Sequence, residues 1–144
     1  MQPQSKAQFL IREATVEDHP FIYSSWLKSF RDGPAVKGIT NSTYYSGQHQ
    51  VIENLITEKS TVILLACNPE DSLHIYGYIV ATENCVHWVY VKLPFRQFGI
   101  CKTLIQALVK TDKKYYTHLP KILHRKASQF SSFEYNPYLL FKKG

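Results

Sequence analysis

Apolar residues along the chain follow two spacings, and these spacings predict the elements of secondary structure. Positions three and four residues apart, which share one face of a helix, predict three helices. These cover about 16–31, 43–58 and 100–111. Runs rich in β-branched and aromatic residues predict five strands. They cover about 9–14, 61–67, 75–82, 86–91 and 115–119. The predicted order is therefore one strand, two helices, three strands, a helix and a further strand.

Polar residues, glycine and proline mark where these elements begin and end. Thr15-Val16-Glu17-Asp18 is typical of a helix start, with an N-cap followed by acidic residues in the first turn. Asp32-Gly33-Pro34 predicts the end of that helix. The turn residues at 68–72 predict that 62–82 form a hairpin, while 33–47 is expected to be a loop.

The tail after residue 119 has weaker patterning. Residues 119–126 fit either a loop or a short helical turn, 128–135 a short helix and 138–141 a final strand. No internal repeat or low-complexity segment interrupts the sequence. Because 144 residues suffice for one substantial core, we expect a single domain over 1–144.

Composition narrows the class of protein. A hydrophobic fraction of 44% is typical of a globular chain. The cysteines Cys67, Cys85 and Cys101 are odd in number and lack C-x-x-C spacing, which argues against a disulfide framework or a zinc knuckle. The histidines show no metal-binding spacing, so no metal site is expected. No apolar run reaches the ~20 residues of a membrane helix, and no apolar signal region opens the chain, so we expect a cytoplasmic protein without a membrane partner.

The stretch 85–108 carries the clearest chemistry. Its strand is apolar on both faces, which predicts a central place in the sheet. Leu93-Pro94 ends the strand, and Gly99 precedes the next helix. The first N–H groups of a helix lack partners within it, and the helix dipole favours an anion there. With Arg96 and Lys102 adding positive charge, this turn is a candidate phosphate site.

The segment 91–101, VKLPFRQFGIC, resembles the coenzyme A signature of GNAT-type N-acyltransferases. That signature is a valine-ended strand followed by R/Q-x-x-G-x-G/A, and Arg96 and Gly99 fit its spacing. Cys101 stands where the family usually has Gly or Ala. The opening IREATVED at 11–18 resembles the start of GNAT domains, and the predicted element order is also theirs. The resemblance implies an α/β (α+β) fold whose mixed, mostly antiparallel sheet is flanked by helices and has a splayed strand pair at the coenzyme site.

The resemblance also implies acetyl-CoA as co-substrate, with no metal. The pantetheine arm would run beside the backbone of Val89, Tyr90 and Val91. The pyrophosphate would lie on the turn and the start of the helix. That part of the site comprises Arg96, Gln97, Phe98, Gly99, Ile100, Cys101 and Lys102.

Acetyl transfer to an amine needs a base, an oxyanion donor and an acid for the leaving thiolate. The family often has a glutamate near the central strand as base, which implies Glu83; His87 is the other candidate but fits a packed strand residue better. Glu83 fits a solvated turn carboxylate equally well. The implied oxyanion donor is a backbone amide such as that of Val91. The implied acid is Tyr135, which also fits an aromatic residue that packs the C-terminal core.

Charge is uneven and supports an alternative function. Residues 1–72 carry a net charge of −2, and residues 73–144 carry +8. The basic half holds the candidate phosphate turn and a run of lysine, arginine and tyrosine over 110–126. It would attract either the phosphates of coenzyme A or a larger polyanion. The sequence therefore predicts an N-acetyltransferase acting on a primary amine or, alternatively, an inactive protein of the same fold that binds an acidic protein or nucleic acid. It does not specify the oligomeric state.

Overall fold

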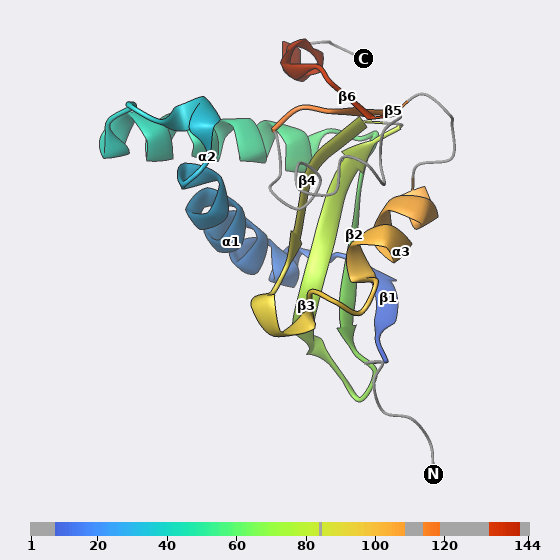
Figure 1. Cartoon of the computed structure of the whole chain (residues 1–144). Coiled ribbons are helices and arrows are strands. Elements are labelled where there is room, and N and C mark those ends of the chain that lie inside the picture. The colour runs from blue at the N-terminus through green and yellow to red at the C-terminus, as the bar shows by residue number, and fades with distance from the viewer. Residues whose placement is uncertain (1–7, 84, 109–113, 119–132, 142–144) are drawn as a thin grey trace.

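The computed structural model describes residues 8–83, 85–108, 114–118 and 133–141. In this part of the chain, six strands form one sheet in chain order (Figure 1). They are β1 Leu10–Glu13, β2 Thr61–Asn68, β3 Asp71–Thr82, β4 Cys85–Val91, β5 Lys114–Tyr116 and β6 Phe133–Tyr135. Strands β1 to β4 are antiparallel to their neighbours, while β5 is parallel to β4 and β6 is parallel to β5.

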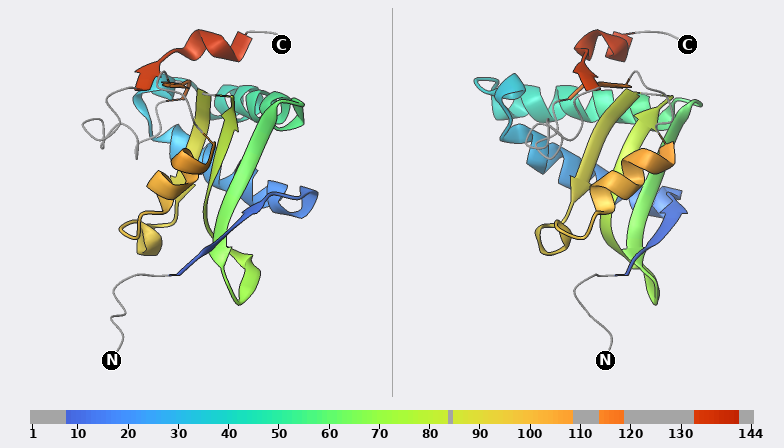
Figure 2. Two further views of the ribbon diagram at one scale, coloured as in Figure 1. Left: turned by 90° about the vertical axis from the view of Figure 1, so that its right-hand side faces the viewer. Right: turned by 45° about the vertical axis from the view of Figure 1, so that its right-hand side comes forward.

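Helices cover both faces of this sheet. α1 (His19–Arg31) and α2 (Asn41–Thr57) lie on one face and α3 (Ile100–Leu108) on the other (Figures 1 and 2). Each face therefore has its own apolar layer, one around Trp26 and Trp88 and the other around Val89 and Leu104. Strands β3 and β4 contribute alternate residues to both layers, because side chains of a strand point to opposite faces in turn. The central position predicted for β4 is confirmed.

The predicted fold class and order of elements are confirmed, while some boundaries differ. α2 begins at Asn41 instead of 43, because the Thr40 hydroxyl accepts a hydrogen bond from the Thr43 N–H and caps the first turn. The expected loop at 33–47 therefore contains a 3₁₀ turn, Pro34–Val36, and the start of this helix. The hairpin of β2 and β3 matches the prediction for 62–82.

The tail was predicted wrongly where it is described. Phe133–Tyr135 is a strand and not the end of a helix, since it pairs with the edge of β5. Pro137–Phe141 is a 3₁₀ helix and not a final strand. The Asn136 side chain accepts a hydrogen bond from the Tyr138 N–H, which starts that helix after the strand. The predictions for 119–126 and for 128–132 lie outside the described residues.

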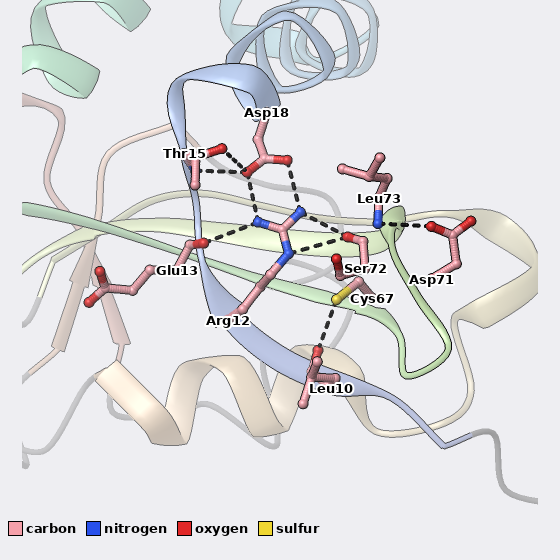
Figure 3. Close-up of polar contacts among 9 residues, drawn as sticks. All are labelled: Leu10, Arg12, Glu13, Thr15, Asp18, Cys67, Asp71, Ser72 and Leu73. Atoms are coloured by element: carbon pink, nitrogen blue, oxygen red, sulfur yellow. Dashed lines mark hydrogen bonds and ion pairs between the residues drawn. The ribbon is translucent and has the colours of Figure 1, made fainter.

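A charged cluster fixes the corner between β1 and α1 (Figure 3). The Arg12 guanidinium donates two hydrogen bonds to Asp18, at 2.8 and 2.9 Å, and also bonds the Ser72 carbonyl in the β2–β3 hairpin. Asp18 accepts a further hydrogen bond from the Thr15 N–H at 2.7 Å. The hydrogen bonds from Arg12 hold the pKa of Asp18 below its usual value. The predicted helix start at Thr15 is confirmed, with a short 3₁₀ turn, Val16–Asp18, leading into α1.

Candidate functional site

One edge of β4 is free of strand pairing for most of its length within the described chain. β5 pairs with β4 only at Cys85 and Val86, and the Thr117 N–H adds one bond to the Val86 carbonyl at 3.2 Å. His87 is the extra residue of a β-bulge opposite β3, and a bulge bends its strand. Within the described residues the pairing of these two parallel strands therefore ends at Val86, as the implied splay at the coenzyme site would require.

The register of β3 and β4 determines which backbone groups face this open edge. The Lys92 N–H donates to the Tyr76 carbonyl of β3 at 2.8 Å, so alternate residues back along β4, including Tyr90, also face β3. The N–H and C=O groups of Val89 and Val91 point the other way, toward the open edge. Of the three residues predicted to line the pantetheine arm, Val89 offers its N–H and C=O there and Val91 offers its N–H, since the Val91 carbonyl accepts a hydrogen bond from Arg96. The Tyr90 ring packs against Tyr78 and Phe21 on the α1 side.

The turn after β4 leads directly into the N-terminus of α3. A 3₁₀ turn, Leu93–Phe95, is followed by Gly99, whose φ of 79° lies in the left-handed region that favours glycine. The Gly99 carbonyl accepts from the Thr103 N–H at 3.0 Å, which starts the helix. A Cβ built on Gly99 meets no atom within 4 Å, so the space beside this residue is open. The turn thus combines a backbone conformation that favours glycine with open space at the N-terminus of α3.

The other predicted coenzyme residues divide into those that face solvent and those that face the core. Gln97 and Lys102 are exposed, and Phe98 is half-buried. Ile100 and Cys101 are buried in the apolar layer under α3, so only their backbone N–H groups are directed to a ligand at the helix N-terminus. The Cys101 side chain therefore belongs to the apolar layer under α3.

Arg96 links the turn to the strand. Its Nε donates to the Val91 carbonyl at 2.6 Å, and the side chain is half-buried. This bond fixes the turn against the end of β4 and holds a positive charge beside the start of α3. Lys92, whose Nζ lies 5.1 Å from the centre of the Phe21 ring, adds a second cation at the same end of the sheet. Of these two cations, Arg96 is the one at the turn, where its charge adds to the attraction of the helix N-terminus for anions.

The predicted catalytic residues lie at the opposite end of β4. Glu83 is exposed in the turn before β4 and has a φ of 53°. Tyr135 belongs to β6, where it pairs with Tyr116, which in turn pairs with Val86 of β4. Since neighbouring strands lie about 4.8 Å apart, the backbone of Tyr135 is roughly 10 Å from β4 in the same row. Partial burial raises the pKa of Tyr135, and neighbouring tyrosines add to the rise.

Sequence reasoning missed a group of buried polar residues at the point where β4 and β5 part. His87, Thr117 and His118 are each no more than 3% exposed and are joined by hydrogen bonds. Burial lowers the pKa of His87 to about 4, so the imidazole is neutral at physiological pH. No local pattern identifies this group, because its members come together only through the parallel pairing of β4 and β5.

Three other features were open to test from the sequence: a metal site, a membrane-spanning helix and a basic binding patch. Within residues 8–83, 85–108, 114–118 and 133–141, no three His, Cys, Asp or Glu side chains are placed to hold a metal ion. No helix of this described part is long and apolar enough to cross a membrane. The basic run at 110–126 falls mostly outside the described residues.

Comparison with known proteins identifies the fold. No family model and no curated protein sequence matches the chain. A protein from Pyrococcus furiosus that is proposed to be an acetyl transferase matches this chain in structure with a TM-score of 0.59 at 13% identity. The match covers 93% of this chain and 89% of that one. A GCN5-related N-acetyltransferase from Rhodopseudomonas palustris has a TM-score of 0.52 at 14% identity, covering 74% and 67%. The chain has the GNAT fold.

A third structural match shows how much of the matched protein this chain covers. The apo form of YjaB from Escherichia coli has a TM-score of 0.52 at 14% identity, covering 71% of this chain. This chain spans 65% of YjaB. At such identities the likeness establishes the GNAT fold alone, and the chemistry has to be argued from the site.

Proposed function

We propose that this GNAT-fold protein is an N-acetyltransferase that moves an acetyl group from acetyl-CoA to a primary amine. The observation that carries the proposal is the continuous path from the open edge of β4 to the glycine turn and the N-terminus of α3. Acetyl-CoA has phosphates at one end and a thioester at the other, joined by a long arm whose amides need hydrogen-bond partners. Val89 and Val91 offer such partners, and Gly99 with the first N–H groups of α3 offers the anion site.

The length of this path supports placing the phosphates of the coenzyme at the turn and its thioester at the other end of β4. Val86 and Val91 are five residues apart, which is roughly 17 Å along a strand. The anion turn follows Val91, whereas Glu83 and Tyr135 lie at the end marked by Val86. An extended coenzyme with its phosphates at the turn would bring its thioester toward these two side chains.

The reaction assigns a role to each group. The acceptor nitrogen attacks the thioester carbonyl, so an N–C bond forms and the C–S bond breaks. Glu83 takes the proton that the nitrogen loses, directly or through water, because it is an exposed carboxylate at the start of β4. The Val89 N–H is the oxyanion donor, because it faces the open edge nearer to Glu83, whereas Val91 lies beside the anion turn. Tyr135 gives a proton to the leaving thiolate, and its raised pKa keeps the phenol protonated until then.

Calorimetric titration with acetyl-CoA tests the binding site. Wild-type protein should bind, and Gly99→Trp should lose at least tenfold in affinity, because an indole would fill the open space beside the turn. Gly38→Trp is a matched control, since Gly38 also has a positive φ, of 91°, and open space around its Cβ, but lies outside the site. No wild-type binding at millimolar acetyl-CoA would refute the proposal. Salt-sensitive retention of nucleic acid in its place would support the alternative, a binding protein.

Kinetics test the chemistry. With a panel of primary amines and measurement of released thiol, Glu83→Gln and Tyr135→Phe should each lower kcat by roughly 10²-fold or more while acetyl-CoA affinity is retained. Glu70→Gln and Tyr45→Phe are the controls, because both residues are exposed and neither is assigned a role in the reaction. Unchanged kcat in Glu83→Gln would exclude that residue as the base.

A further inference from the structure

A chain of side-chain hydrogen bonds crosses the buried layer between the sheet and α2. Gln48 Nε2 lies 3.1 Å from His118 Nε2, and His118 Nδ1 lies 2.8 Å from Thr117 Oγ1. Thr117 Oγ1 lies 3.0 Å from His87 Nδ1, and His87 Nε2 lies 2.9 Å from Thr82 Oγ1. The chain therefore links α2, β3, β4 and the segment that follows β5. We refer to these five side chains as the histidine relay.

The available hydrogen atoms determine which group donates and which accepts in each hydrogen bond of the relay. The Gln48 amide nitrogen only donates, so the facing Nε2 of His118 accepts and its proton sits on Nδ1. The Nδ1–H of His118 donates a hydrogen bond to Thr117 Oγ1, and the Thr117 hydroxyl in turn donates to His87 Nδ1. His87 must carry its proton on Nε2 and donate it to Thr82. Both imidazoles are thus neutral, and the two rings hold opposite tautomers.

The relay lies at the point where the pairing between β4 and β5 ends. The Thr117 N–H bonds the Val86 carbonyl, which is the last link between the segment of β5 and β4 before they part. His87 is the bulged residue of β4 directly beyond that link. The His118 ring is wedged among Trp26, Phe30 and Trp88, with ring centroids 5.1 to 6.3 Å away. The relay therefore joins the two diverging strands to each other and to the helical layer at one point.

The two imidazole rings of the relay have no free nitrogen to offer to a substrate. Both nitrogens of His87 and both nitrogens of His118 already have partners within the relay. A substrate amine would have to break one of these buried bonds to reach an imidazole. Buried polar networks in which every member is satisfied make the surrounding structure rigid, and this is the property that the relay supplies.

We propose that His87, Thr117 and His118 are positioning residues, which fix the point where β4 and β5 diverge and thereby the inner end of the open edge that receives the acyl thioester. This inference rests on the proposed function. Without the relay the described backbone links between this segment and β4 would be two residue pairs and one further hydrogen bond. The open edge would then vary in length, and the coenzyme would lose affinity.

Thr117 offers a matched pair of variants. Thr117→Ser keeps the hydroxyl that joins the two imidazoles, while Thr117→Val keeps the shape and removes it. Thr117→Val leaves one ring nitrogen of His87 and one of His118 without a partner, which is costly in a buried site. We expect acetyl-CoA affinity to fall at least tenfold in Thr117→Val and to stay within threefold of wild type in Thr117→Ser.

The experiment combines calorimetric titration of acetyl-CoA with nitrogen NMR of the full chain. Long-range ¹⁵N spectra of wild type should show neutral rings with the proton on Nδ1 of His118 and Nε2 of His87. Exchange of the Thr117 amide hydrogen should be at least tenfold faster in Thr117→Val than in Thr117→Ser. Two rings in the same tautomer, or equal exchange in the two variants, would overturn the inference.

The readouts separate this inference from the proposed function. Absence of wild-type binding would refute the proposed function, and the tautomers and amide exchange would still decide whether the relay fixes the strands. Wild-type binding with equal affinity in Thr117→Val would refute the positioning role alone. If Thr117→Val does not fold, His118→Asn replaces it. That variant keeps a donor near the Nδ1 position and loses the bond to Gln48, so it should also weaken binding, and unchanged affinity would count against the inference.

Discussion

Acidification from pH 7.5 to pH 5 should destabilise this protein strongly through its two buried histidines. Burial lowers the pKa of His87 to about 4 and that of His118 to about 3, and the proximity of His87 adds to the shift of His118. In the unfolded chain a histidine has a pKa of about 6.5. Because the folded pKa values are depressed, the stabilisation is fully present above pH 6.5 and is lost as the pH falls toward 4.

The magnitude follows from the difference in bound protons. At pH 5 the unfolded chain holds nearly one proton on each of these histidines, while the folded protein holds almost none, so unfolding is favoured. Each ring then contributes a loss of about 2 kcal/mol relative to pH 7.5, and the two together about 4 kcal/mol. This is a large share of the roughly 5–15 kcal/mol that stabilises a typical domain. The neutral relay explains the sensitivity, because the Gln48 amide faces His118 Nε2 with a donor, so a proton added to that nitrogen would point at another N–H group.

Urea unfolding at both pH values, followed by tryptophan fluorescence, measures the effect. Trp26 and Trp88 are buried beside His118 and report directly on this layer. His118→Gln is the comparison, since it removes one titrating ring and keeps a polar group that reaches toward Gln48. The loss between the two pH values should shrink by about 2 kcal/mol in that variant, and the remaining histidines cancel in the difference. An equal loss in wild type and variant would refute the reasoning.

Three further predictions concern the sheet, the β1 corner and the turn. Gly77→Ala should destabilise by about 2 kcal/mol in urea unfolding, since its Cβ would lie 2.6 Å from a carbonyl of β4, whereas Gly47→Ala in α2 meets nothing and should not destabilise. Asp18→Asn should cost about 2 kcal/mol at pH 7 and lose less stability than wild type as the pH falls below about 4. The reason is that the pKa of Asp18 is lowered by folding, so its stabilising contribution is present above the unfolded pKa and is lost in acid. Asp32→Asn, at an exposed position outside this cluster, should leave the stability at pH 7 unchanged. Arg96→Met should weaken acetyl-CoA binding roughly tenfold by calorimetry, through loss of the bond that fixes the turn, and retained affinity would exclude that role.

Local patterns in the sequence were sufficient to predict the order of the elements and the shape of the turn. The spacing of Ile22 and Trp26 identified α1, and the position of Gly99 identified the strand–turn–helix connection. These features depend on residues that are close in the chain. The GNAT resemblance then supplied the sheet type, which the structure and its neighbours confirm.

Features that depend on distant pairing were not predictable in this way. Phe133–Tyr135 is too short for a periodic pattern, and its strand conformation comes from pairing with β5. The histidine relay brings together residues 48, 82, 87, 117 and 118, whose local contexts are a helix, strands and a strand end. Arg12 was placed in the first strand, but its contacts with Asp18 and Ser72 follow only from the fold. The roles of Glu83 and Tyr135 remain predictions that the kinetic variants test.

The short pairing between β4 and β5 also bears on how the protein opens. Strands β2, β3 and β4 form a continuous antiparallel meander with short turns, while β5 and β6 are attached through a few residue pairs each. The β5–β6 edge is therefore the segment expected to unfold locally at lowest cost, with the meander still intact. A ligand bound along β4 would have this edge as one of its walls. Occupancy of the site would then suppress the local opening and couple ligand concentration to the survival of that edge under proteolysis.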